Sequence, residues 1–184
     1  MSTSIFSRNN FRYAALASVI AIGTFGASNS FAVGASADAS ATVIAPIAIT
    51  KAVDLVFGSF ARGAGGTVTV STSGARTASG TILSTIGSTS SAAKFDVTGE
   101  GVSTYSITWS GDTELTTGVG GAGETMALAR ISDLVAGNAT SGEVTSGVLT
   151  AGAQSIYLGG TLTVGAAQVA GAYTGSVTAT VEYN

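Results

Sequence analysis

The feature that most constrains this chain is the spacing of its apolar residues, which recur at every second position far more often than at every third or fourth. The C-terminal stretch is the clearest case, where one series of alternating residues is apolar and the other is polar: Val177, Ala179, Val181 and Tyr183 against Ser176, Thr178, Thr180 and Glu182. Successive side chains of a β-strand point to opposite faces of a sheet, so this period predicts half-buried strands. The chain is therefore predicted to be all-β.

Short apolar or alternating runs, separated by turns that contain Gly and Ser, predict strands within residues 41–49, 54–60, 66–72, 80–86, 93–99, 104–110, 125–131, 146–152, 154–164 and 173–183. Many short strands at regular spacing are typical of a sandwich or a barrel. Few aromatic residues are available for the core, so we expect all of the following to be at least partly buried: Phe57, Phe60, Phe95, Tyr105, Trp109, Tyr157 and Tyr173.

The first residues have the pattern of a secretory signal peptide. Arg8 and Arg12 precede the apolar run "YAALASVIAIGTFG", and the small-x-small signature Ser30-Phe31-Ala32 predicts cleavage after Ala32, with a second choice after Ala37. We therefore expect a signal peptide at residues 1–32, an N-terminal extension at 33–49 and one domain at 50–184. The mature chain has no further transmembrane segment, so we expect export through the periplasm to the cell surface or the medium.

The residues that are missing exclude several classes of function. Residues 33–184 contain five Lys and Arg against ten Asp and Glu, a net charge of −5, which does not favour nucleic acid as a partner. The chain has no Cys and no His, so disulfides and the commonest general base and metal ligand are absent. Asp112 and Glu114 lie two residues apart, but their turn-like surroundings favour a solvated loop. We expect no enzyme activity, no catalytic or metal site and no cofactor.

The N-terminal extension has one apolar face, formed by Ala37, Ala39, Ala41, Val43, Ala45, Ile47 and Ile49. Pro46 cannot donate a hydrogen bond to a sheet, so it should lie at an edge, a bulge or a joint between two strand segments. This pattern fits either an ordinary first strand with a frayed start or a strand that is donated to another sheet.

Four stretches carry a resemblance to known proteins: "ATVIAPIAITKAVDLVFGSF", "GTVTVSTSGARTASG", "FDVTGEGVSTYSITW" and "GGTLTVGAAQVAGAYTGSVTATVEYN". Together they resemble an exported bacterial family classed as a domain of unknown function. More distantly, an "L-x-FG" motif and a "G-x-Y-x-G-x-V-x-x-x-V-x-Y" ending are similar to the spore coat protein U and archaic chaperone–usher pilin group. The matching residues are Leu55, Phe57 and Gly58 in the first motif, and Gly171, Tyr173, Gly175, Val177, Val181 and Tyr183 in the second. The cysteine pair that many such pilins carry is missing.

The pilin resemblance implies an incomplete immunoglobulin-like antiparallel β-sandwich, completed by the N-terminal extension of a neighbouring subunit. The predicted donor strand is then Ala39, Ala41, Val43, Ala45, Ile47 and Ile49, and the final strand beside it contains Tyr173, Val177, Val181 and Tyr183. A final strand that continues to residue 183 with nothing behind it would leave an apolar edge open, so we expect a further strand to cover it.

Strand donation between copies gives a fibre or pilus-like homopolymer, or one with related subunits, assembled with a periplasmic chaperone and an usher. The alternative is a monomeric surface binding or adhesin module whose own extension fills the gap.

Overall fold

The computed structural model describes residues 32–86 and 88–184, and these residues contain β-strands and no helix. The predicted signal peptide lies almost wholly outside the described residues. Nothing within them forms a helix long and apolar enough to cross a membrane. The chain divides into two units at the boundary between Ala41 and Thr42. Residues 32–41, the described part of the first unit, are exposed and form no strand, and the strands of the described residues lie in the second unit.

The described residues form twelve strands, most of them short, as the spacing of turn residues predicts. In chain order they are β1 (Ala48–Val53), β2 (Phe60–Ala61), β3 (Gly66–Val70), β4 (Arg76–Ser79), β5 (Ile82–Leu83), β6 (Ala93–Thr98), β7 (Thr104–Gly111), β8 (Glu114–Thr116), β9 (Thr125–Asp133), β10 (Ser146–Val148), β11 (Ala153–Val164) and β12 (Val177–Tyr183).

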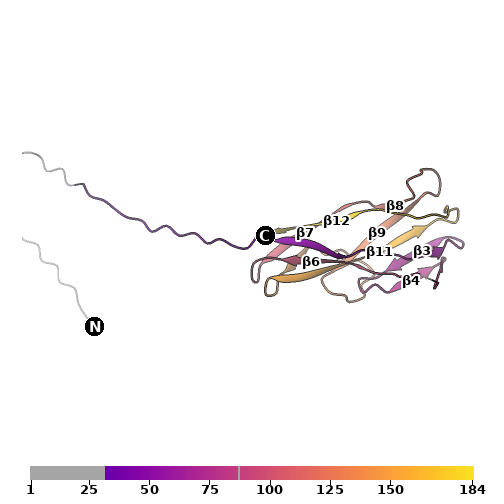
Figure 1. Cartoon of the computed structure of the whole chain (residues 1–184), viewed down its shortest axis with the longest axis horizontal. Helices are drawn as coiled ribbons and strands as arrows, with labels where there is room; N and C mark the ends of the chain where they lie inside the picture. Colours follow the sequence, from indigo (N-terminus) through magenta and orange to yellow (C-terminus); the bar gives the residue numbers. More distant parts are fainter. Residues whose placement is uncertain (1–31, 87) are drawn as a thin grey trace, which may run out of the picture. The chain divides into compact units, whose positions relative to one another are not determined.

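The largest sheet has seven strands arranged around β11, which is the longest strand (Figure 1). One edge of β11 pairs first with β6 and then with β3, while its other edge pairs with β9. β1 extends the sheet beyond β6, β4 beyond β3 and β8 beyond β9, and all these pairs are antiparallel. β11 changes partner near Gly159, where a Cβ atom would lie 2.2 Å from the Val70 carbonyl oxygen. Glycine at this position therefore allows the two backbones to approach.

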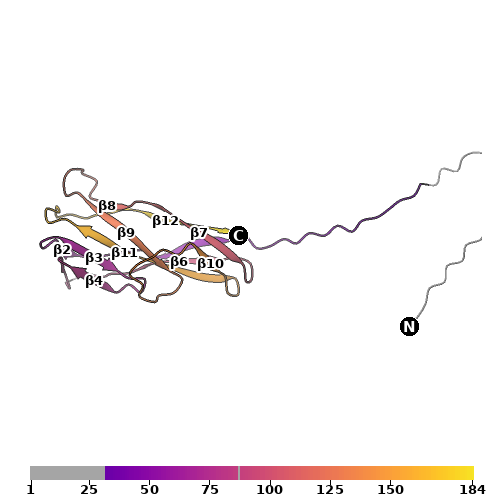
Figure 2. The ribbon, with the colours of Figure 1, turned by 180° about the vertical axis from the view of Figure 1, so that it is seen from behind.

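A second sheet, with the order β10-β7-β12, supplies the other layer (Figure 2). Its inward side chains meet those of β6 and β11 in a cluster that we call cluster 1, whose buried members are Ala93, Phe95, Val97, Tyr105, Ile107, Leu149, Ile156, Leu158, Ala179 and Val181. The fold is an antiparallel β-sandwich, as the alternation predicts. β12 buries Ala179 and Val181 and exposes Thr178, Thr180 and Glu182, which confirms its predicted faces.

A second group of buried side chains lies at the other end of the large sheet and is called cluster 2: Phe57, Val68, Val70, Met126, Leu128, Leu162 and Val164. All seven aromatic residues that were expected in the core are buried or half-buried. Phe95 and Trp109 pack edge to face with ring centroids 6.0 Å apart. The few large side chains thus gather where the two layers meet.

The first strand begins two residues earlier than the predicted domain boundary at residue 50. Ile49 pairs with Val97 of β6, and Ile47 and Ile49 both pack against cluster 1. The apolar face of the N-terminal extension is thus divided at Pro46, because Ile47 packs against the domain's own core and Ile49 lies in the domain's own sheet. Upstream, residues 33–46 are exposed and form no strand; we call them segment 33–46.

Candidate functional site

An open groove of about 1140 Å³ lies beside cluster 2. One side of the groove is residues 54–62, which follow β1 and are called the first wall; the other is residues 168–177, which lead into β12 and are called the second wall. Its floor is formed by apolar side chains of the large sheet: Ala93, Phe95, Leu115, Met126, Leu128, Leu158, Leu162 and Val164. The groove therefore exposes part of the core between two stretches of extended chain.

The first wall is extended like a strand, and only one of its two edges is paired. Val56 exchanges both backbone hydrogen bonds with Ser91, at 2.9 and 3.0 Å. Because successive residues of an extended chain direct their backbone groups to opposite edges, Leu55 directs its amide and carbonyl away from Ser91. Among the described residues neither group of Leu55 has a hydrogen-bond partner. This edge of the first wall is free to pair.

The second wall has the same arrangement. Thr174 exchanges both backbone hydrogen bonds with Thr116 of β8, each at 2.9 Å. Ser176 bonds Asp112 on that same side: its amide donates to the Asp112 carboxylate at 2.7 Å, and its carbonyl accepts from the Asp112 amide at 2.7 Å. The backbone groups of Tyr173 and Gly175 alternate with these, and they have no partner within the part of the chain that the structure describes. The second wall thus has a free edge as well.

Separate polar anchors fix the two walls. Arg76 donates from its guanidinium to the carbonyl oxygens of Phe57, at 2.9 Å, and Ser59, at 3.2 Å, which holds the first wall. Gln168 is buried and its side-chain amide donates to the carbonyls of Gly123, at 2.7 Å, and Thr125, at 2.9 Å, which holds the second. Each wall thus has its own anchor in the rest of the domain.

One hydrogen bond joins the walls: the Arg62 guanidinium donates to the Gln168 carbonyl at 2.7 Å. Elsewhere, the facing edges carry unpaired amides and carbonyls above an apolar floor. An extended segment can satisfy such edges through its own backbone and place alternate apolar side chains on the floor. The groove has the chemistry of a strand-accepting site.

The predicted final strand is divided between this groove and the core. Tyr173 and Val177 line the second wall, whereas Val181 is buried in cluster 1. Tyr183 packs against cluster 1 and its hydroxyl donates to the Ala45 carbonyl at 3.0 Å. The structure therefore brings two of the four predicted residues to the candidate site.

The predicted donor residues lie on both sides of Pro46. Ala39 and Ala41 are exposed in the first compact unit, and Val43 and Ala45 are exposed in the second. Val43 is 96% exposed and does not line the groove of its own domain. Ile47 and Ile49, by contrast, are half-buried against their own core.

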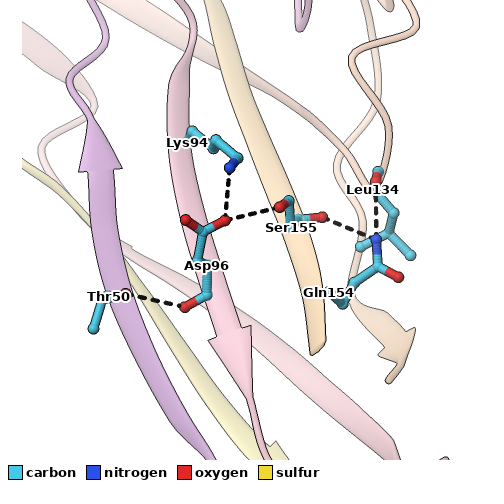
Figure 3. A network of polar contacts seen from close by, with 6 residues as sticks. All are labelled: Thr50, Lys94, Asp96, Leu134, Gln154 and Ser155. Atoms are coloured by element: carbon cyan, nitrogen blue, oxygen red, sulfur yellow. Dashed lines mark hydrogen bonds and ion pairs between the residues drawn. The ribbon is translucent and has the colours of Figure 1, made fainter. Parts of the chain in front are cut away.

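The carboxylates of Asp112 and Asp96 both accept hydrogen bonds from the chain itself. Asp112 and Glu114 are both exposed: Asp112 lies in the turn between β7 and β8, where its carboxylate accepts from the Ser176 amide, and Glu114 is the first residue of the edge strand β8. Asp96 accepts hydrogen bonds from Lys94, at 2.9 Å, and Ser155, at 2.8 Å (Figure 3). The bond from Lys94 and then that from Ser155 hold the pKa of Asp96 below its ordinary value. No group of three metal-ligating side chains gathers within residues 32–86 and 88–184.

Sequence reasoning found the second wall but not the first. Residues 54–60 were predicted as a strand because they form a short apolar run with Leu55, Phe57 and Phe60, yet only one bridge, at Val56, forms before β2. The anchors Arg76 and Gln168 were not singled out either. An isolated Gln within the apolar stretch "GAAQVAGAY" is the signal that could have identified Gln168 as a buried hydrogen-bonding residue.

A family model described as a domain of unknown function, DUF4402, matches residues 47–183. The match begins just before β1 and ends with β12, so it includes both walls of the groove and leaves out segment 33–46. No curated protein and no solved structure matches the chain.

Proposed function

The chain belongs to the DUF4402 family, and on that premise we propose that it is an exported structural subunit of a surface fibre or pilus-like assembly, polymerising by donor-strand complementation. The observation that carries the proposal is the groove, which combines an apolar floor with two unpaired strand edges. Unpaired backbone groups beside exposed core side chains are costly and prone to aggregation, which favours a strand as the occupant.

Segment 33–46 of a second copy is the strand that the proposal places in the groove. It is exposed, forms no strand in its own subunit, and alternates small apolar residues with Ser, Asp and Thr up to Val43. Fourteen extended residues span roughly 45 Å, which is ample for a groove bordered by walls of nine and ten residues. Its apolar side chains would cover cluster 2 while its backbone pairs with Leu55, Tyr173 and Gly175.

Donation from each copy to the next is a heterologous contact that does not close, so it builds a filament. The resemblance to spore coat protein U and archaic chaperone–usher pilins supports the same assembly, with a periplasmic chaperone occupying the groove in transit and an usher at the outer membrane. The wall residues Leu55, Phe57, Tyr173, Gly175 and Val177 are among those that carry this resemblance.

A matched pair of substitutions in segment 33–46 tests the proposal. Val43→Asp alters the apolar face and Thr42→Asp its polar neighbour, and both positions are exposed in the subunit. We expect residues 33–184 to form ladders of oligomers that survive mild detergent, because a strand buried along its length leaves only as a whole. Val43→Asp should abolish the ladder and Thr42→Asp should preserve it, as measured by unheated gel electrophoresis and light scattering.

Deletion of residues 33–45 provides the complementary test. The truncated chain should remain monomeric, fold poorly alone and gain thermal stability when a synthetic peptide of residues 33–47 is added. A truncated chain that melts at the same temperature with and without peptide would contradict the proposal.

A further inference from the structure

A ring of three hydrogen bonds holds the base of segment 33–46. The Tyr183 hydroxyl donates to the Ala45 carbonyl at 3.0 Å, and the Ala45 amide donates to the Glu100 carboxylate at 3.0 Å. The ring is closed by the Glu100 amide, which donates to the Tyr183 hydroxyl at 2.6 Å. We call these contacts the Ala45 clamp. They use both backbone groups of Ala45, outside any sheet.

The sequence around the Ala45 clamp accommodates the Tyr183 hydroxyl. A Cβ atom at position 99 would lie 2.2 Å from that hydroxyl and 2.9 Å from the Leu149 side chain. Gly99 is absent from the residues with positive φ, so its backbone does not itself require glycine. The missing side chain at position 99 is therefore what leaves space for the hydroxyl in the clamp.

The clamp and the groove lie at opposite ends of the same two strands. Ala45 precedes the start of β1 and Tyr183 is the last residue of β12, whereas the first wall follows the end of β1 and the second wall precedes the start of β12. Figure 1 shows the C-terminus beside the beginning of β1. A subunit therefore holds Ala45, at the base of segment 33–46, at the end of these strands that is opposite its own groove.

To enter its own groove, segment 33–46 would have to turn back at residues 45–47 and run beside β1. The segment would use several of its residues to pass the six residues of β1 before it reached the first wall. Such a turn would also remove the Ala45 backbone from Tyr183 and Glu100. Pro46 opposes it further, because the residue before a proline favours an extended conformation.

We propose that the Ala45 clamp directs segment 33–46 into the groove of a second copy and away from its own; this rests on the proposed function. The clamp acts as a positioning device, since none of its residues lines the groove. A turn at residues 45–47 into the subunit's own groove would break the two contacts that involve Ala45, so the clamp disfavours the closed monomer without weakening the groove.

Disulfide trapping distinguishes the two destinations, because the chain contains no Cys. Ala39→Cys and Ala172→Cys place one thiol in the segment and one on the second wall, both at exposed positions. Oxidation of residues 33–184 carrying this pair should give a covalent ladder by non-reducing electrophoresis. Tyr183→Phe, introduced into the same double-cysteine chain, removes only the hydroxyl of the clamp. It should raise the ratio of internally crosslinked monomer to ladder roughly 2- to 10-fold, because this is the effect of losing one hydrogen bond.

Glu100→Ala breaks the Ala45 clamp from the other side and should act in the same direction. Tyr157→Phe is the matched control, since Tyr157 is half-buried and no hydrogen bond of its hydroxyl occurs within the described chain. An unchanged ladder in both clamp variants would overturn the inference while leaving the proposed function intact. A crosslink within one chain, formed while Tyr183 and Glu100 are unchanged, would also overturn the inference and would favour the self-complemented monomer. Absence of any crosslink would overturn both, because the segment would then not enter a groove at all.

Discussion

Cluster 1 and cluster 2 are built from the same strands of the large sheet, but they differ in what covers them. Cluster 1 lies between two sheets, with β6 and β11 on one side and β7 and β12 on the other. Cluster 2 continues under β3, β9 and the second half of β11, where most of its members line the open groove. The difference indicates that the alternating pattern specifies a buried face along the whole sheet, while the chain provides a complete second layer for only one half.

The largest expected effect tests the covered half. Val181→Asp places a carboxylate within cluster 1, where no cation is available, and should lower the free energy of unfolding by at least about 3 kcal/mol. Glu182→Lys changes the neighbouring exposed residue and should stay within about 0.5 kcal/mol. Urea denaturation of both variants measures the contrast. Equal tolerance would mean that β12 is not an integral part of the core.

A second pair of substitutions compares the two clusters directly. Leu149→Ala empties an enclosed site in cluster 1 and should cost about 2–5 kcal/mol. Leu128→Ala removes a side chain that borders the groove, where the space left is open to water, and should cost about half as much.

Addition of the peptide of residues 33–47 should bring the cost of Leu128→Ala close to that of Leu149→Ala, because the bound strand encloses cluster 2. Denaturant midpoints with and without peptide provide the measurement. If the peptide leaves the ratio of the two costs unchanged, cluster 2 is not the surface that a donated strand covers.

The alternating strands of both halves could be predicted from the sequence, whereas the short polar edge strands and the first wall of the groove could not. The faces of β12 and the positions of β3, β6, β7, β9 and β11 follow from alternation, because each of these strands has a buried and an exposed face. β4 and β8 were missed because Arg76–Ser79 and Glu114–Thr116 are short and mainly polar. The first wall alternates like a strand, but one of its edges has no partner within the domain.

The Ala45 clamp has no local sequence signature. It joins residues 45, 100 and 183, and only tertiary structure brings such distant positions together. The glycine at position 99 did not indicate the clamp either, because a glycine before Glu100 is consistent with an ordinary hairpin turn.

The smallest expected effect concerns the outer face of the sheet over cluster 1. Asp96 has a lowered pKa, so its contribution to stability is present above its ordinary value of 3.8 and is lost as the pH falls through the lower folded value. Asp96→Asn should therefore lower the melting temperature slightly at neutral pH, and the difference from wild type should vanish in strong acid. Glu182→Gln, an exposed control, should show no such trend; a constant difference at every pH would contradict the role of the Lys94–Asp96 pair.

The central position of β11 has a consequence for the order in which the chain can fold. β3, β6 and β9 all precede β11 in the sequence, and each pairs with it. During synthesis from the N-terminus, these strands emerge before the strand that joins them. Of the three pairings, that between β3 and β11 closes the longest loop. Sheets that depend on such distant pairings fold slowly and expose strand edges while they wait. The emerging chain therefore needs protection from aggregation until residue 164 is free to pair.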